Sequence, residues 1–195
     1  IEQGTIYFYH RAAAQVEMRT GADEQEERAR LERAKERTAQ QLSDMAEKAR
    51  EEAGDEAAVL FETHAMFLED EDYTGAMDEL LAQGFNAEYA VDQAGQEFAA
   101  MLASMDDPYM QARAADIKDV TGRILNNLMG VVEGGIDSDV PVILCADDLA
   151  PSETIQLDKK KILGFVTEQG SANSHTAILA RTMDCLLYTS PSPRD

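Results

Sequence analysis

One stretch decides how the rest of the chain is interpreted: residues 170–181, with the sequence GSANSHTAILAR. The run before it, residues 161–167 (KILGFVT), is rich in apolar and β-branched residues and predicts a strand. The small polar residues that open the stretch predict a tight turn, and the apolar residues after Thr176 predict a helix. The predicted order is strand, loop and helix, with His175 in the first helical turn.

His175 has a position that suits phosphate chemistry. The first N–H groups of a helix have no partners within the helix, and the helix dipole places partial positive charge there. A phosphate is well held at such a point, and the same field favours a neutral imidazole with a nucleophilic nitrogen. A histidine near a helix start is also common as a cap or a surface residue, and the pattern alone leaves both interpretations open.

Residues 170 and 173–181 resemble the active-site signature of the phosphoenolpyruvate-utilising enzymes, with Ser171 where Gly or Ala is usual. Residues 149–154 (LAPSET) and 61–70 (FETHAMFLED) also resemble this family, and are most similar to Enzyme I of the sugar phosphotransferase system. The three motifs stand in the family's order and spacing. The resemblance therefore implies the N-terminal part of a phosphoenolpyruvate–protein phosphotransferase.

The resemblance also implies a role for each matching residue. His175 would accept the phosphoryl group, Thr154 would hydrogen-bond the ring and orient it, and N–H groups around Ser174, Thr176 and Ala177 would hold the phosphate. The family takes phosphate from phosphoenolpyruvate with Mg²⁺ on a C-terminal domain, and passes it to the histidine-containing phosphocarrier protein in sugar uptake. We expect that domain, its Mg²⁺ and the homodimer contact to be absent here, so the fragment should hold no cofactor or metal and not react with phosphoenolpyruvate alone. No role is predicted for Arg181.

A second set of residues is implied to contact the carrier protein. Its members combine Met and aromatic side chains with surrounding carboxylates, which suits an apolar-centred contact with a basic partner. They are Asp55, Glu56, His64, Met66, Phe67, Glu71, Asp72, Tyr73 and Arg113. Without the resemblance, His64 is a packing residue and the carboxylates are a solvated acidic face.

The fold expected is α/β, with an inserted all-helical subdomain that binds the carrier. Strands at residues 4–9, 141–146 and 161–167 would form a parallel sheet, because strands and helices alternate along the chain. Helices are predicted at residues 23–52, 55–68 and 74–82, then after the caps Asn86 and Asp107. The swivelling phosphohistidine domain would comprise residues 1–10 and 131–184, and the helical subdomain residues 11–130. Residues 185–195 depart from the family pattern and predict a disordered tail.

Composition narrows the choice of partners. The formal net charge is −21, which argues against nucleic acid and anionic membrane surfaces. Two cysteines, Cys145 and Cys185, give no disulfide framework and no metal-binding spacing. We find no signal peptide or apolar run of membrane-spanning length, so the cytoplasm is the expected compartment and no membrane insertion is expected.

Two other functions stay open at this point. A pyruvate phosphate dikinase or phosphoenolpyruvate synthase shares the swivelling domain, although the acidic helical insertion argues against it. A non-catalytic helical interaction module is the second alternative, and phosphorylation of His175 would distinguish it.

Overall fold

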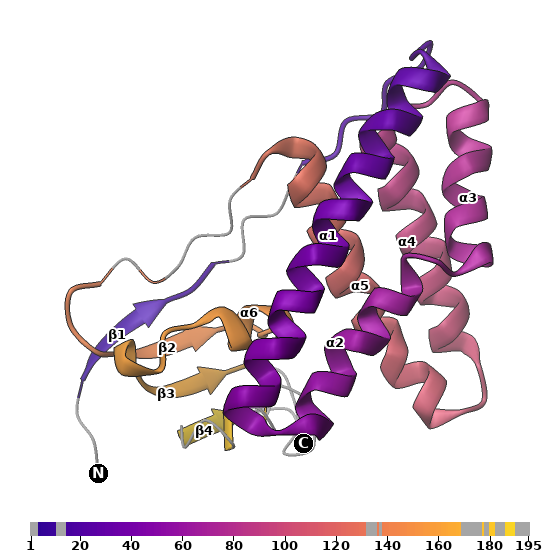
Figure 1. Ribbon diagram of the computed structural model, residues 1–195. Coiled ribbons are helices and arrows are strands. Elements are labelled where there is room, and N and C mark those ends of the chain that lie inside the picture. The colour runs from indigo at the N-terminus through magenta and orange to yellow at the C-terminus, as the bar shows by residue number, and fades with distance from the viewer. Residues whose placement is uncertain are drawn as a thin grey trace. The chain divides into compact units, whose positions relative to one another are not determined.

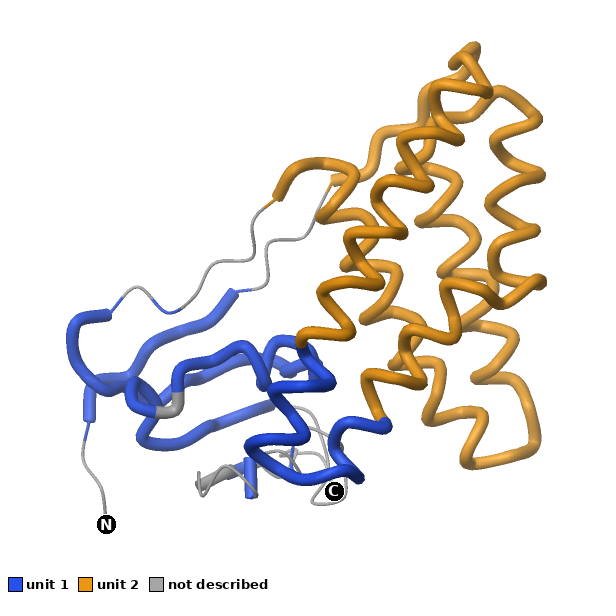
Figure 2. The backbone as a smooth tube through the Cα atoms, viewed as in Figure 1, with its two compact units in different colours: residues 1–12, 45–59, 134–195 blue, residues 13–44, 60–133 orange. Residues whose placement is uncertain are grey.

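The computed structural model describes residues 4–10, 15–131, 136, 138–168, 177, 180–181 and 186–189. The chain divides into two compact units, which have different colours in Figure 2. The sheet unit comprises residues 1–12, 45–59 and 134–195, and the helical unit comprises residues 13–44 and 60–133. Residues 45–59, which the sequence assigned to the helical subdomain, thus group with the sheet unit. Helical periodicity identifies a helix but says nothing of the neighbours on which it packs.

Four parallel strands form the sheet, in the order β1-β2-β3-β4. They are β1 (Thr5–Phe8), β2 (Val142–Ala146), β3 (Ile162–Thr167) and β4 (Leu186–Thr189), as labelled in Figure 1. The first three confirm the predicted strands and their parallel pairing. A short helix, α6 (Pro151–Gln156), follows β2, and a 3-10 turn, η1 (Lys159–Lys161), leads into β3. Parallel strands end at one edge of the sheet, so α6 begins at that edge.

The core of the sheet unit comes from the two central strands and the segments that connect them. Its buried members are Ile136, Val142, Leu144, Leu149, Leu157, Ile162, Phe165 and Ala180. Val142 and Leu144 alternate along β2, whereas β3 buries four of its six residues. A strand buried on both faces reads as a continuous apolar run, which is why both strands were recognisable in the sequence.

β4 corrects one prediction. Residues 186–189 were expected to belong to a disordered tail, but they pair in parallel with β3, with Leu186 opposite Gly164 and Thr189 opposite Thr167. Leu186, Leu187, Tyr188 and Thr189 have the strand propensity that makes this pairing possible. The Pro-rich and Ser-rich residues that follow dominated the prediction. Residue 185 and residues 190–195 lie outside the described residues.

A long helix, α1 (Glu24–Ala53), opens the helical part of the chain and is followed by α2 (Asp55–Phe67). One face of α1 is buried along its length, at Leu31, Ala34, Thr38, Leu42, Met45 and Ala49. Gly54 stands between the two helices with φ of +90°, in the left-handed region that glycine adopts without strain.

Three further helices complete the helical unit: α3 (Glu71–Ala82), α4 (Ala87–Ser104) and α5 (Pro108–Met129). α3 begins three residues earlier than predicted, because the Asp70 carboxylate accepts the N–H groups of Asp72 and Tyr73 and so caps the helix. The predicted start of α5 is confirmed, with the Asp107 carboxylate accepting the Tyr109 N–H at 2.8 Å. α4 packs against both α3 and α5. It approaches α5 so closely at Gly95 that a Cβ there would overlap the Thr121 side chain.

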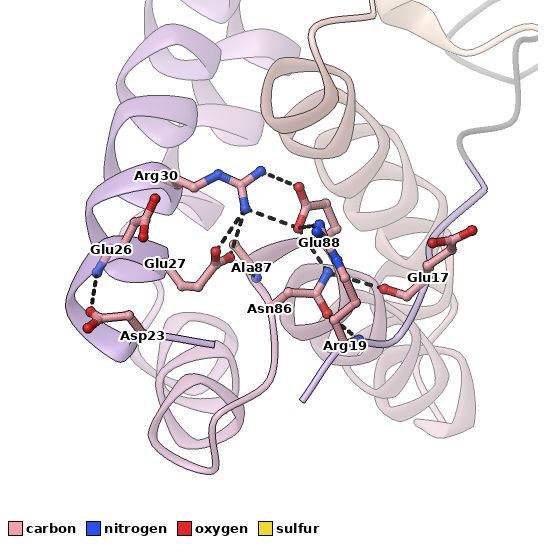
Figure 3. A network of polar contacts seen from close by, with 9 residues as sticks. All are labelled: Glu17, Arg19, Asp23, Glu26, Glu27, Arg30, Asn86, Ala87 and Glu88. Atoms are coloured by element: carbon pink, nitrogen blue, oxygen red, sulfur yellow. Dashed lines mark hydrogen bonds and ion pairs between the residues drawn. The ribbon is translucent and has the colours of Figure 1, made fainter. Parts of the chain in front are cut away.

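A network of charged groups joins α1 to the start of α4 (Figure 3). Arg30 binds both Glu27 and Glu88, and Glu27 also accepts the Ala87 N–H at 2.7 Å. Burial raises the pKa of Glu88, but hydrogen bonds from Arg30 and Asn86 outweigh it and hold that pKa below its usual value. The Asn86 side chain is engaged by this network, so it makes no side-chain cap, although Asn86 does occupy the predicted N-cap position.

Candidate functional site

Thr154 lies on α6, just beyond the carboxyl end of β2. Its side chain is completely buried. Its hydroxyl group donates a hydrogen bond to the Ala150 carbonyl oxygen at 3.0 Å. Because the hydrogen is used in this bond, the oxygen presents its lone pairs to any further partner. Thr154 therefore has a buried hydroxyl oxygen that can accept a further hydrogen bond, on the helix that follows β2.

Two side chains fix the start of α6. The Glu153 carboxylate accepts the Ala150 N–H at 2.7 Å with one oxygen and the Tyr9 hydroxyl at 3.0 Å with the other. Tyr9 follows β1 directly, and its N–H continues the pairing to the Cys145 carbonyl at 2.8 Å. A chain of hydrogen bonds thus ties the residue after β1 to the helix that carries Thr154. Sequence reasoning missed both Tyr9 and Glu153, because their separation of 144 positions gives no local signal.

The helix predicted to carry His175 in its first turn is described only in part. Ala177, Ala180 and Arg181 are helical, and the side chains of Ala177 and Ala180 are buried. Arg181 is exposed. His175, Ser174 and Thr176 lie outside the described residues, so the roles predicted for them stay predictions.

The nine residues predicted to contact a partner have different environments. Asp55 and Glu56 are exposed and belong to the sheet unit. In the helical unit, Glu71 and Asp72 are exposed and Met66 is 70% exposed. These residues are accessible to a partner.

His64 and Tyr73 are completely buried, which excludes the direct contact predicted for them. The His64 ring packs edge-on against Phe61, with Nε2 3.3 Å from Asp116 Oδ1. The Tyr73 hydroxyl lies 2.7 Å from the Thr121 hydroxyl, and burial raises the pKa of Tyr73. Both residues lie on the core-facing side of their helices, so they support the surface from beneath.

Arg113 is held between two aromatic rings. Its guanidinium carbon lies 4.7 Å from the centroid of the Phe67 ring and 5.7 Å from that of Tyr109. Such cation–π contacts orient a guanidinium without consuming its hydrogen-bond donors. Phe67 is 4% exposed, whereas Tyr109 is 65% exposed. The pair Tyr109 and Arg113 has the four-residue spacing of one helix face, which is the signal that would have added Tyr109 to the predicted set.

The family description "PEP-utilising enzyme, N-terminal" matches residues 1–113, and "PEP-utilising enzyme, mobile domain" matches residues 139–185. The chain belongs to the PEP-utilising enzymes. The two matches together include the α6 segment with Thr154, the segment that contains His175, and the whole of α1 to α4.

Relatives of this chain include bacterial proteins named phosphoenolpyruvate-protein phosphotransferase. The protein of Priestia megaterium is 41% identical over 171 residues, which are 87% of this chain and 30% of that protein. The protein of Lactococcus lactis subsp. lactis (strain IL1403) is 42% identical over 171 residues, 86% of this chain and 30% of that protein. The chain thus spans about 30% of the length of these relatives.

Solved structures extend the similarity to the fold. The solution structure of Enzyme I (nEIt) superposes with a TM-score of 0.76 at 32% identity, covering 94% of this chain and 76% of that chain. The N-terminal domain of Enzyme 1 – Nitrogen superposes with a TM-score of 0.70 at 25% identity, covering 95% and 77%. Like the Enzyme I N-terminal domain, this chain is mostly helical with a small parallel sheet.

The described ranges of the chain contain neither a metal-binding cluster nor a membrane-spanning helix. No three His, Cys, Asp or Glu side chains there gather in a way that could hold a metal ion. No helix in those ranges combines the length and apolar character that crossing a membrane requires.

Proposed function

We propose that this chain carries a phosphoryl group on His175 and exchanges it with the histidine-containing phosphocarrier protein. The observation that carries the proposal is the buried Thr154 hydroxyl, an acceptor at the carboxyl edge of the parallel sheet. The signature around His175 and the names of the relatives support the same function. The two family matches support a mobile, swivelling phosphohistidine domain with a helical insertion.

The chemistry follows from the protonation of the imidazole. Thr154 already donates its hydrogen to Ala150, so it accepts a hydrogen bond from one N–H of the neutral ring. The other ring nitrogen then has the lone pair that attacks phosphorus. A nitrogen–phosphorus bond forms while the bond between phosphorus and its donor atom breaks, and the donor keeps that electron pair. N–H groups around Ser174, Thr176 and Ala177 would balance the charge of the phosphoryl oxygens.

The phosphate would come from phosphoenolpyruvate, bound elsewhere in the full-length protein. Mg²⁺ supplies charge neutralisation of the phosphate in such transfers. The resemblance to Enzyme I puts this ion on a separate C-terminal domain, and that placement is part of the proposal. The same proposal includes a role in sugar uptake and a location in the cytoplasm. It also includes dimerisation of the full-length protein through that C-terminal domain.

The carrier protein would dock on the helical unit. Met66 and Tyr109 offer exposed apolar surface, Arg113 offers an oriented guanidinium, and Glu71 and Asp72 offer negative charge. Such a surface suits a partner with an apolar centre and basic surroundings.

The test uses phosphorylated carrier protein as the donor and intact mass as the measurement. The wild-type chain should gain one acid-labile phosphoryl group, and His175→Ala should gain none. His10→Ala is the matched control, because His10 is an exposed histidine of the same chain, and it should be phosphorylated as the wild type is. An acid-stable adduct, or one that survives His175→Ala, would refute the proposal.

A further inference from the structure

A hollow of about 130 Å³ lies between α1 and α5, within the helical unit. Its lining comes from one face of α1 and from the end of α5, at Arg30, Arg33, Ala34, Arg37, Asn127 and Leu128. The four α1 positions recur at intervals of three or four, so their side chains share one face of the helix. The space is sufficient for several water molecules, and therefore for a small tetrahedral anion.

The charge of this hollow is opposite to that of the chain. Three guanidinium groups line it and no carboxylate does, in a protein with a net charge of −21. Other cations of α1 are paired: Arg28 binds Glu24 and Asp78, and Lys35 binds Glu32. The hollow is therefore locally positive in a protein whose net charge is strongly negative.

The three arginines of the hollow differ in their availability. Arg30 is neutralised by Glu27 and Glu88 (Figure 3). Arg33 and Arg37 are exposed, and neither forms an ion pair with any residue that the structure describes. Two adjacent guanidinium groups thus keep their charge and their hydrogen-bond donors for a ligand.

The remaining wall gives shape without charge. Asn127 donates to the Thr38 hydroxyl at 2.9 Å and to the Gln41 side-chain oxygen at 3.0 Å. These bonds use both hydrogens of the Asn127 amide, so this side chain is fixed in place and has no donor left for a ligand. Ala34 is buried and adds an apolar methyl group to the lining. Recognition must therefore come from Arg33 and Arg37.

We propose that Arg33 and Arg37 bind a small phosphate-bearing anion. Guanidinium groups match the geometry of phosphate oxygens with pairs of parallel N–H donors. A doubly charged anion would satisfy the two unpaired arginines, whereas the size of the hollow favours inorganic phosphate or a small phosphomonoester over a nucleotide. This site is separate from the residues proposed for phosphotransfer and does not depend on them.

The test measures the side-chain Nε–H resonances of the arginines by NMR in the full chain, during titration with inorganic phosphate. Chloride is varied to keep the ionic strength constant, so that general screening contributes equally at each point. The resonances of Arg33 and Arg37 should move saturably, and Arg33→Gln with Arg37→Gln should weaken binding by at least tenfold. A parallel titration with glycerol phosphate identifies the source: saturation with both ligands indicates a phosphomonoester site, and saturation with inorganic phosphate alone indicates a site for the free ion.

The matched control removes the same charge elsewhere. Lys118 and Lys160 are exposed and lie outside the hollow, so Lys118→Gln with Lys160→Gln should bind phosphate as the wild type does. Circular dichroism checks that the arginine variant keeps its helical content, and each single arginine variant should weaken binding by a smaller factor. Shifts that stay linear, an unchanged affinity in the arginine variant, or an equal loss in the lysine variant would each overturn the proposal.

Discussion

The helical unit and the sheet unit are built in different ways. The helical unit has long helices with continuous buried stripes, side-chain caps such as Asp70 and Asp107, and a charged network at Arg30. The sheet unit has strands of four to six residues, and its β1 strand exposes Ile6 and Phe8. Neighbouring residues therefore set the helix starts of the first unit, whereas the sheet of the second unit depends on contacts between distant segments. A candidate docking surface lies on the first, and the buried hydroxyl proposed for catalysis lies on the second.

The largest expected difference concerns two phenylalanines. Phe61 is completely buried in the helical unit, and Phe61→Ala should lower its free energy of unfolding by about 3–5 kcal/mol, because it removes packed area and leaves a cavity. Phe8 is 68% exposed on β1, and Phe8→Ala should change stability by only about 0.5 kcal/mol. Urea unfolding followed by circular dichroism measures both. Equal losses would show that the sheet unit packs more tightly than its exposed strand indicates.

The second prediction concerns the charged network of the helical unit. Glu88→Gln should destabilise it by about 1–3 kcal/mol at neutral pH, because the partner Arg30 loses a charged acceptor. Against the effect of burial, hydrogen bonds from Arg30 and Asn86 hold the pKa of Glu88 in the folded state below its ordinary value of 4.5. The contribution of ionised Glu88 to the free energy of unfolding is therefore fully present above pH 4.5. It is lost as the pH falls through the lower pKa that Glu88 has in the folded state.

Urea unfolding at a series of pH values tests this sign. Wild type should lose stability below pH 4.5 more steeply than Glu88→Gln does. Glu97→Gln, at an exposed position on the same helix, should have the pH dependence of the wild type. If the free energy of unfolding depends on pH in the same way for wild type and Glu88→Gln, the charged network does not contribute to the stability of the helical unit through the charge of Glu88.

The difference between the units also explains which structural features could be predicted from the sequence. Helix starts depend on neighbouring residues, so Asp107 followed by Pro108 predicted α5 correctly. Asp70 has the same capping role, but the acidic run after it obscured the apolar pattern and the predicted start of α3 was wrong. A motif match indicates which residues gather at a site without indicating which are accessible. His64 and Tyr73 were therefore assigned to a surface from which the structure excludes them.

The candidate site in the sheet unit was less predictable. The position of Thr154 after a strand was readable, because parallel strands bring their ends to one edge. The direction of its hydrogen bond was not, because that depends on the Ala150 carbonyl and the geometry of one helical turn. The strand at residues 186–189 was missed because its pairing partner is remote in sequence, and local propensity competed with Pro and Ser nearby.

The third prediction separates docking from chemistry. Tyr109→Ala should weaken binding of the carrier protein by about tenfold, or about 1.4 kcal/mol, because it removes an exposed aromatic that also orients Arg113. The rate of phosphoryl transfer at saturating carrier should be unchanged. Thr154→Val should lower the rate of phosphoryl transfer at least tenfold, because it removes the hydrogen-bond acceptor proposed for the His175 ring. The affinity for the carrier protein should be unchanged.

Calorimetry gives the affinity and rapid-quench kinetics give the transfer rate. Thr154→Ser keeps the hydroxyl group and should restore most of the rate, which distinguishes orientation of the ring from a general loss of packing. A lowered rate in Tyr109→Ala, or a lowered affinity in Thr154→Val, would mean that docking and chemistry are not divided between the two units.

The smallest expected effect tests how the sheet unit is held together. Tyr9→Phe removes the hydroxyl that donates to Glu153 and should lower the stability of the sheet unit by about 0.5–1.5 kcal/mol. Tyr188→Phe is the matched control on β4, where the side chain is exposed, and should be neutral. A double-mutant cycle with Glu153→Gln isolates the pair, and the two changes should be non-additive by at least about 0.5 kcal/mol. Additive losses would show that this bond does not couple the residue after β1 to α6. The start of α6, and with it the position of Thr154, would then depend on local capping by Glu153 alone, in the manner of the helical unit.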